Sequence, residues 1–253
     1  MSPLSPIALI TGGARRVGAA MARHLAGRGW SVLLHWNTSQ EEAEALRDEL
    51  GAAATLLQAD LVSAAGRQDL VRQTREILAG RPLGLLVHNA SVFPHARLAE
   101  LTDEGVDRLF ALHVRTPLLL SRDLAPDLAA GRGLVLTMLD AGARLHWPGY
   151  LPYALSKLAL REATIALARE LAPDVRVCGL EPGFILPPED APAAYRQAEA
   201  QRLTRESGSP AELLKALDYL LEATFVTGEI LTVDGGRRWI RPLAPRLGDA
   251  GRA

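Results

Sequence analysis

The sequence predicts an α/β protein with a doubly wound parallel sheet, and two observations support this prediction. Seven short apolar runs alternate with longer segments rich in Ala, Leu, Arg and Glu at helical spacing, and most runs are apolar at consecutive positions. Consecutive apolar residues indicate strands buried on both faces, and the alternation with helices indicates a parallel sheet with right-handed crossovers. The expected strands span residues 7–11, 31–36, 54–60, 83–90, 133–140, 175–182 and 229–236.

The overall composition is that of one globular domain. The 253 residues are 48% hydrophobic and 23% charged, and no repeat or linker divides them, so a single domain over residues 1–253 is expected. A net charge of −1 gives no general attraction to nucleic acid or to an anionic membrane. The single cysteine, Cys178, excludes an internal disulfide, and neither a bilayer-spanning run nor a secretory leader is visible. These features favour a cytoplasmic protein.

The first expected strand runs into the stretch TGGARRVG at residues 11–18. Gly12, Gly13 and Gly18 surround the start of a helix, where glycines allow a tight turn and bring backbone N–H groups close to a pyrophosphate. The pattern is typical of a dinucleotide site, although an ordinary glycine-containing strand–helix turn produces it too. Arg16 stands where a third pattern glycine is expected.

The end of the second expected strand favours NADPH over NADH. A site for NADH usually places an acidic residue here to hold the ribose 2′-hydroxyl, whereas the first carboxylates of this stretch are Glu41 and Glu42. The residues expected around a 2′-phosphate instead are His35, Asn37, Thr38, Ser39 and, from the glycine turn, Arg15. The alternative is a solvated helix start with Thr38 or Ser39 as its N-cap residue, and the two roles are compatible.

Polar residues also follow the next two expected strands. Asp60 closes the third strand, where its carboxylate can accept a hydrogen bond from an adenine amino group. Asn89, Ala90 and Ser91 follow the fourth strand, where they would support the cofactor and line its pocket. Because ligands of open α/β sheets bind at the carboxyl ends of the strands, these residues are expected in one site. Each is also compatible with a plain loop turn.

The stretch YALSK carries the strongest chemical signal. Tyr153 and Lys157 are four residues apart on an expected helix, which puts a phenol and an ammonium group on one face. A nearby cation favours tyrosinate and lowers the phenol pKa from its usual value of about 10. Such a pair can exchange a proton with a substrate while a nicotinamide exchanges hydride.

Together these motifs resemble the short-chain dehydrogenase/reductase family over essentially the whole chain. The matching stretches are TGGARRVG, AD at residues 59–60, NAS at 89–91, YALSK, EPGFI at 181–185 and TGEILTVDGG at 227–236. The resemblance implies a Rossmann-type fold, NADP(H) as cofactor, Tyr153 as proton donor or acceptor, and Lys157 as a partner of the nicotinamide ribose. The further cofactor contacts that it implies are Arg16, Val17, Leu61, Pro182, Gly183 and Ile185.

Three residues depart from the pattern of that family. It usually carries a substrate-binding serine 13 residues before the tyrosine, where this chain has Asp140. A carboxylate beside the phenol opposes tyrosinate and offsets the lysine, which favours a protonated Tyr153 that delivers its proton to a basic atom. Arg16 replaces the pattern glycine, and His113 stands at the position of a helix asparagine. Taken singly, Arg16 is compatible with a helix surface, Asp140 with a loop cap and His113 with a core side chain.

With Arg16 and Asp140 together, this chain resembles the pteridine reductases. With His113 in LHVRTP, it is similar to the bacterial dihydromonapterin/dihydrofolate reductases of that branch. This resemblance implies that Phe93 stacks on one face of a pterin, with nicotinamide on the other, and that Arg16 and Ser91 hydrogen-bond the pterin. Loop packing is the alternative role for Phe93.

The sequence therefore predicts NADPH-dependent reduction of a dihydropterin (dihydromonapterin, dihydrobiopterin or dihydrofolate-like) by hydride transfer to a C=N bond. The expected catalytic residues are Asp140, Tyr153 and Lys157, and no metal is expected. One alternative is an NADP(H)-dependent ketone or alcohol oxidoreductase of the same family. The other is a non-catalytic protein that binds NADP(H).

The arginine-rich tail bears on assembly. The family is commonly tetrameric, so a homotetramer is expected, in which Arg237, Arg238 or Arg241 could reach the site of a neighbouring subunit. The alternative is a frayed polar terminus.

Overall fold

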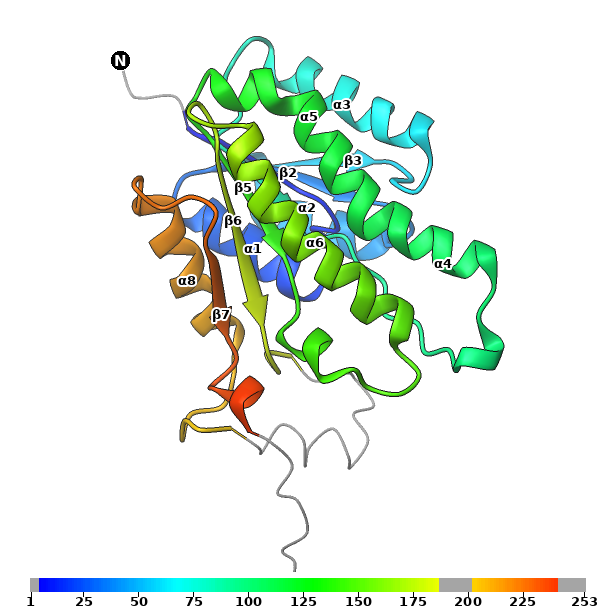
Figure 1. Cartoon of the computed structure of the whole chain (residues 1–253). Helices are drawn as coiled ribbons and strands as arrows, with labels where there is room; N and C mark the ends of the chain where they lie inside the picture. Colours follow the sequence, from blue (N-terminus) through cyan, green and yellow to red (C-terminus); the bar gives the residue numbers. More distant parts are fainter. Residues whose placement is uncertain (1–4, 187–201, 241–253) are drawn as a thin grey trace, which may run out of the picture.

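The computed structural model describes residues 5–186 and 202–240 and centres on one seven-stranded sheet (Figure 1). The strands are β1 (Ile7–Ile10), β2 (Ser31–Trp36), β3 (Ala54–Gln58), β4 (Leu85–His88), β5 (Leu134–Met138), β6 (Arg176–Pro182) and β7 (Ile230–Val233). All neighbouring pairs are parallel, in the order β3-β2-β1-β4-β5-β6-β7. The expected doubly wound parallel sheet is confirmed, and its strand order reverses between β1 and β4.

Helices cover both faces of this sheet, as Figure 1 shows. One face carries α1 (Arg16–Gly27), α2 (Gln40–Leu50) and α8 (Pro210–Glu222). The other carries α3 (Ala64–Leu78), α5 (Thr116–Ala129) and α6 (Leu151–Glu170). Helix α4 (Asp103–Phe110) continues into α5 through a π-helical turn, η3 (Ala111–Arg115). The short 3-10 turns are η1 (Gly51–Ala53), η2 (Leu98–Glu100), η4 (Ala141–Leu145) and η5 (Arg237–Trp239).

The core explains why the strands are apolar at consecutive positions. In β1, Ala8 and Ile10 pack with α1 and α8, whereas Ile7 and Leu9 point to the opposite face and pack with α3 and α5. Successive side chains of a strand alternate between faces, and both faces here are buried. Burial of each large apolar side chain stabilises the folded state by about 1.5–3 kcal/mol, so the helices on both faces hold the sheet in place.

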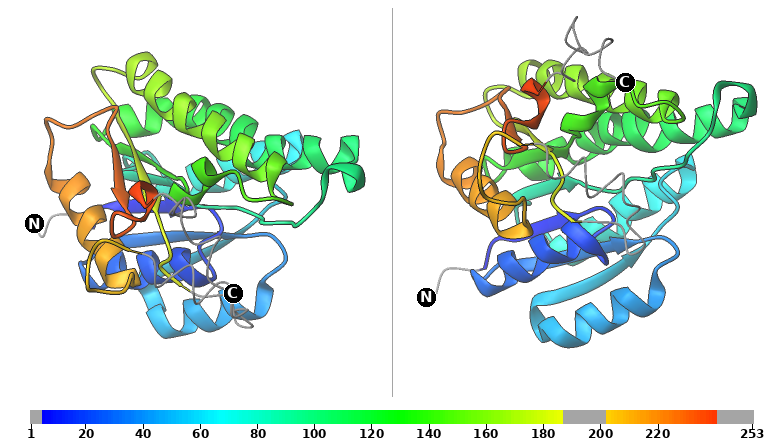
Figure 2. Two further views of the ribbon diagram at one scale, coloured as in Figure 1. Left: turned by 60° about the horizontal axis from the view of Figure 1, so that its bottom comes forward. Right: turned by 90° about the horizontal axis from the view of Figure 1, so that it is seen from below.

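Several strands end earlier than the sequence indicates, and this is where the site forms. The run at 54–60 leaves the sheet after Gln58, and the run at 83–90 is a strand only over Leu85–His88. The polar residues Asp60 and Asn89 thus lie in loops beyond the ladder. The right-hand view of Figure 2, from below, looks onto the carboxyl ends of the strands, where these loops gather.

Within the described ranges, no helix is long and apolar enough to cross a membrane. Over the same residues, no group of three or more His, Cys, Asp or Glu side chains could hold a metal ion. The thiol of Cys178 is free and buried in the sheet.

Candidate active site

The glycine turn after β1 leaves no room for a Cβ atom at two of its positions. Gly12 has φ +60°, and a Cβ on Gly18 would overlap the Gly12 carbonyl oxygen and lie 2.6 Å from Asn89 Nδ2. Arg16 also adopts the left-handed region, with φ 50°. This conformation favours glycine and costs an L-residue about 1–2 kcal/mol. The structure thus explains why a glycine is expected at position 16.

The ends of β1 and β4 are held together by Thr11 and Asn89. The Asn89 amide donates to the carbonyl oxygens of Thr11 and Gly12, at 3.0 and 2.8 Å. The Thr11 hydroxyl accepts from the backbone N–H groups of Asn89 and Ala90, at 3.0 and 3.1 Å, and donates to the Val87 carbonyl. Asn89 therefore fixes the glycine turn, since both N–H bonds of its side chain are used inside the protein.

His35 has a different role from the one expected. Its ring is 2% exposed; Nδ1 accepts from the Gly12 N–H at 3.1 Å, and Nε2 lies 3.0 Å from the Ala59 carbonyl oxygen. Nε2 therefore carries the proton, and burial lowers the pKa of His35 to about 4. With both ring nitrogens engaged, the side chain has no donor for a 2′-phosphate. It instead links the glycine turn to the end of β3.

A cavity of about 630 Å³ opens over this turn, and we call it the glycine-turn cavity. The expected cofactor residues in its wall are Gly12, Arg15, Arg16, Val17, His35, Asn37, Thr38, Ser39, Asp60, Leu61, Asn89, Ala90, Ser91, Tyr153, Lys157 and Pro182. Ser39 is the N-cap residue of α2 but makes no side-chain cap bond. Arg15 is half-exposed and forms a 3.4 Å ion pair with Glu42, a weak surface interaction.

Two of the expected cofactor residues lie elsewhere. Gly183 lines a neighbouring cavity, and Ile185 is buried and lines neither of the two. A cofactor contact of Ile185 stays a prediction.

The second cavity, of about 390 Å³, has aromatic walls, and we call it the aromatic cavity. It shares Arg16, Phe93 and Tyr153 with the glycine-turn cavity. The Phe93 ring is stacked on Tyr150, with centroids 4.2 Å apart, and meets Tyr153 edge-on at 4.5 Å. Sequence reasoning gave no role to two aromatic residues of this wall, Trp147 and Tyr150, because no motif marks them. It also gave none to Phe184 and Asp234, although these lie inside the matching stretches EPGFI and TGEILTVDGG.

Asp140 and Tyr153 make direct contact at the boundary of the two cavities. The phenol donates to Asp140 Oδ2 at 2.7 Å, while Asp140 Oδ1 accepts from the Gly142 N–H at 2.6 Å and caps η4. The two roles considered for Asp140, a loop cap and a partner of the phenol, therefore coexist on its two oxygens. Lys157 lies one turn further along α6 and donates to the Met138 carbonyl oxygen at 2.8 Å.

The electrostatics of this group correct one expectation. Burial, followed by the charge of Asp140, raises the pKa of Tyr153 well above its usual value. The ammonium of Lys157 lies 6.0 Å from the ring centroid and does not reverse this shift. Burial raises the pKa of Asp140 and lowers that of Lys157 to about 8. The expected lowering of the phenol pKa is therefore wrong, whereas a protonated Tyr153 agrees with the predicted effect of Asp140.

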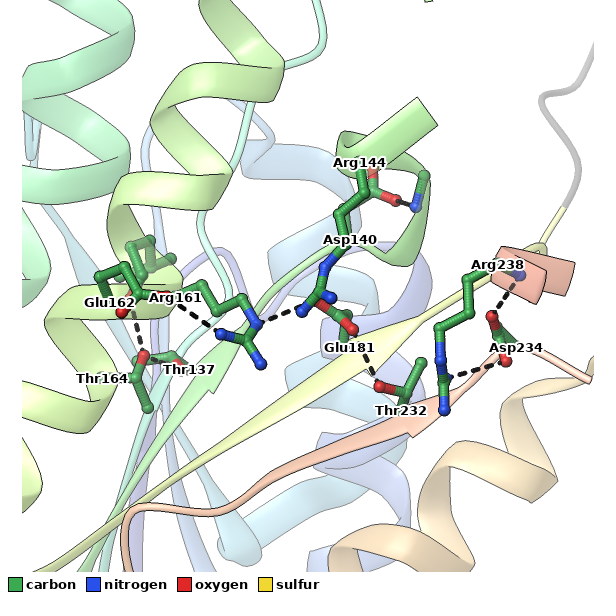
Figure 3. Close-up of polar contacts among 12 residues, drawn as sticks. Thr137, Asp140, Arg144, Arg161, Glu162, Thr164, Glu181, Thr232, Asp234 and Arg238 are labelled. Atoms are coloured by element: carbon green, nitrogen blue, oxygen red, sulfur yellow. Dashed lines mark hydrogen bonds and ion pairs between the residues drawn. The ribbon is translucent and has the colours of Figure 1, made fainter. Parts of the chain in front are cut away.

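A buried carboxylate lies at the end of β6 and is surrounded by polar partners (Figure 3). Glu181 is 2% exposed and accepts a hydrogen bond from Thr232 at 2.8 Å. Its other oxygen lies 3.7 Å from guanidinium nitrogens of both Arg144 and Arg161. This cluster ties η4 and α6 to β6 immediately before Pro182, and so fixes the backbone on which both cavities rest.

The arginines after β7 lie at the cavity of their own chain. Arg237 is over the Phe184 ring, 4.6 Å from its centroid, and Arg238 pairs with Asp234 at 3.2 Å. Figure 3 shows the Arg238–Asp234 pair beside the end of β6. A reach of these side chains toward a neighbouring subunit stays a prediction, and Arg241 lies outside the described residues.

Comparisons with known proteins agree with these features. Residues 12–238 match a protein-family model described as enoyl-(acyl carrier protein) reductase. A dihydromonapterin reductase from Enterobacter sp. (strain 638) is 33% identical over 93% of this chain and 98% of that protein. One from Citrobacter koseri is 32% identical over 90% and 95%. This chain belongs to the short-chain dehydrogenase/reductase family.

Two solved structures are similar to this chain over nearly its whole length. The FolM alternative dihydrofolate reductase 1 of Brucella canis, complexed with NADP, has a TM-score of 0.86 and 34% identity, with 96% of this chain and 98% of that one covered. Its counterpart from Brucella suis, also with NADP, has a TM-score of 0.84. This short-chain dehydrogenase/reductase brings its three unusual residues close together: Arg16 and Asp140 line one cavity, and the His113 ring is 5.7 Å from that of Tyr153.

We predict that Gly18→Ala weakens nucleotide binding while the chain stays folded. The added methyl group would meet the Gly12 carbonyl and the Asn89 amide, so the turn must shift. Titration with NADPH should show at least a tenfold weaker affinity. The matched control is Gly27→Ala, on the same helix with nothing within 4 Å of the added methyl group, which should bind like the wild type. Equal affinity in both variants would contradict the assignment of this turn.

We predict a loss of kcat/KM for NADPH as the pH rises through about 8, where buried Lys157 loses its proton. The lysine is charged below that pH and neutral above it, and kcat/KM reports the pKa of the free enzyme. Tyr153 stays protonated over this range because its pKa is raised. Lys157→Arg keeps a cation and should lack this decline. A flat wild-type profile through pH 8 would contradict the prediction.

Proposed function

We propose that this protein is an NADPH-dependent reductase of a dihydropterin. The observation that carries the proposal is the hydrogen bond from Tyr153 to Asp140, placed where the two cavities share a wall. A carbonyl-reducing member of the family has a serine at position 140 to donate to a carbonyl. Here a carboxylate keeps the phenol protonated, which suits proton delivery to a ring nitrogen.

The glycine-turn cavity fits a dinucleotide. A turn that excludes Cβ atoms at Gly12 and Gly18 presents backbone N–H groups at the start of α1, as a pyrophosphate requires. The hydroxyl groups of Thr38 and Ser39, with Arg15 alongside, favour the 2′-phosphate of NADPH. When bound, NADPH supplies the hydride.

The protein's own residues then perform the proton chemistry. Tyr153 donates its proton to the nitrogen of a C=N bond whose carbon accepts the hydride, so that both atoms of the bond are reduced. Asp140 holds the phenol proton until the substrate nitrogen takes it. Lys157, fixed by the Met138 carbonyl, supplies a positive charge beside the tyrosinate that forms.

The aromatic cavity fits a flat heteroaromatic ring. Phe93, backed by Tyr150, offers a rigid ring at the boundary of the two cavities. Arg16 lies at the same boundary, where its guanidinium can bind ring nitrogen or oxygen acceptors. The names of the relatives, dihydromonapterin reductase and alternative dihydrofolate reductase, point to the same substrate class.

The decisive experiment is a substrate panel with a proton-donor variant. We predict that the wild type oxidises NADPH with dihydromonapterin, dihydrobiopterin or dihydrofolate but not with simple ketones, and that Tyr153→Phe loses at least 100-fold in kcat. Turnover of ketones alone would establish the ketone reductase instead. NADPH binding without turnover of any compound would establish a non-catalytic protein.

Arg16→Gly is the matched variant for substrate class. It relieves the left-handed strain at this position and removes a side chain that also donates to the Leu186 carbonyl at 2.9 Å. NADPH affinity should be retained, while kcat/KM for the dihydropterin falls by about 10- to 100-fold through the lost charged hydrogen bond. An unchanged kcat/KM would remove Arg16 from the substrate site.

We further propose that the protein acts in the cytoplasm as a homotetramer. Phe225 and Tyr219 are large exposed side chains near the edge strand β7, and contact between subunits would cover them. Sedimentation at micromolar concentration should give the mass of a tetramer, and Phe225→Asp should reduce it. A monomeric wild type would contradict this proposal.

A further inference from the structure

His113 lies buried between the loop after β4 and helix α6. It is 1% exposed and belongs to the π-helical turn η3, which directs its ring toward both elements. Nε2 lies 3.1 Å from the Ser91 hydroxyl and 3.2 Å from the Val92 backbone nitrogen. Nδ1 lies 2.8 Å from the hydroxyl of Ser156, one residue before Lys157. The ring thus bridges the wall of the glycine-turn cavity and the helix that carries Tyr153.

One backbone group fixes the direction of the hydrogen bonds around His113. The Val92 N–H can only donate, so Nε2 of His113 must be the unprotonated nitrogen. The proton of the ring is then on Nδ1 and is donated to Ser156. The Ser156 hydroxyl in turn donates to the Tyr153 carbonyl oxygen at 2.7 Å, which leaves its oxygen free to accept from His113.

The same logic fixes the hydroxyl of Ser91. Since Nε2 is an acceptor, the single proton of Ser91 is donated to it. The Ser91 oxygen then keeps lone pairs for a donor, and Ser91 lines the glycine-turn cavity together with Arg16, Phe93 and Tyr153. Burial also lowers the pKa of His113 to about 3, so the ring stays neutral at physiological pH and the direction does not reverse.

We infer that His113 is a positioning residue that makes Ser91 a hydrogen-bond acceptor and thereby selects a substrate bearing an N–H group. The inference rests on the proposed function and deepens it. A ketone offers only an acceptor oxygen and gains nothing from this serine, whereas the ring N–H and amino groups of a dihydropterin do. An N–H of the nicotinamide carboxamide has the same chemistry, so the test must separate the two sources.

The test uses two pteridines as probes of the complex with NADP. One is 2,4-diaminopteridine, which carries N–H donors, and the other is unsubstituted pteridine, which has none. The wild type should prefer the diamino compound, and Ser91→Ala should lose about two- to tenfold of that preference. A wild type without a preference would overturn the inference whether or not dihydropterins are turned over.

Two substitutions of His113 separate its two nitrogens. Asn reaches only the Nδ1 position, so His113→Asn should lose as much preference as Ser91→Ala, and the double variant should lose no more than either. Gln places an oxygen near the Nε2 position, so His113→Gln should keep the preference. Thermal melting checks that each variant is folded. Full preference in His113→Asn, with loss in Ser91→Ala, would overturn the role of His113.

Two readouts are independent of turnover. In the ¹⁵N NMR spectrum, Nδ1 of His113 should be protonated and Nε2 unprotonated, without change between about pH 5 and 8, the range in which an ordinary histidine titrates. A protonated Nε2 would overturn the inference. In Ser91→Ala and His113→Asn, any fold-change in affinity for NADPH alone should be smaller than the fold-loss of preference between the two pteridines. A loss confined to NADPH affinity would place the N–H on the cofactor and overturn its assignment to the substrate.

Discussion

The hydrogen bond between Tyr153 and Asp140 is the interaction on which the site depends. It joins the first turn of α6 to the loop that follows β5. The carboxylate cannot turn away, because its second oxygen caps η4 through Gly142. Cavities for a nucleotide and for a flat ring meet at this bond, so its geometry fixes how the hydride and the proton arrive at one substrate. The Glu181 cluster contacts η4 and α6, the two elements that the bond joins. The hydrogen bonds from His113 through Ser156 to the Tyr153 carbonyl support the same turn of α6.

The fold was largely predictable because burial on both faces of the sheet leaves a direct mark on the sequence. Ile7, Ala8, Leu9 and Ile10 divide between two core clusters, which requires four consecutive apolar residues. The ends of the strands were less predictable. Leu83 and Ala90 are as apolar as the strand between them, and only the loss of ladder hydrogen bonds excludes them. Apolar patterning reports burial, and burial continues beyond the strand.

The site was predictable where its residues come directly after a strand, and it was missed where they lie farther along a loop. Arg16, Asp60, Ser91 and Asp140 were found because the carboxyl ends of parallel strands share one edge. Trp147 and Tyr150, between η4 and α6, have no such spacing, and only the packed chain brings Tyr150 to Phe93 and Trp147 to Phe184. The effect of Lys157 on the pKa of Tyr153 is overestimated from the sequence for a similar reason, because helical spacing is visible in a sequence whereas the burial that raises this pKa is not. The opposing effect of Asp140 is predicted correctly. His35 shows that a polar residue at the right edge can serve the backbone instead of the ligand.

The left-handed backbone at Arg16 has an evolutionary consequence. A chain with glycine at this position already has the turn that Arg16 adopts, so a change to arginine requires no rearrangement of the nucleotide site. Its cost is about 1–2 kcal/mol of strain, which a domain with a typical stability of about 5–15 kcal/mol tolerates. The side chain then emerges at the wall shared by the two cavities. One substitution in the glycine turn can thus add a cation to the wall that the two cavities share.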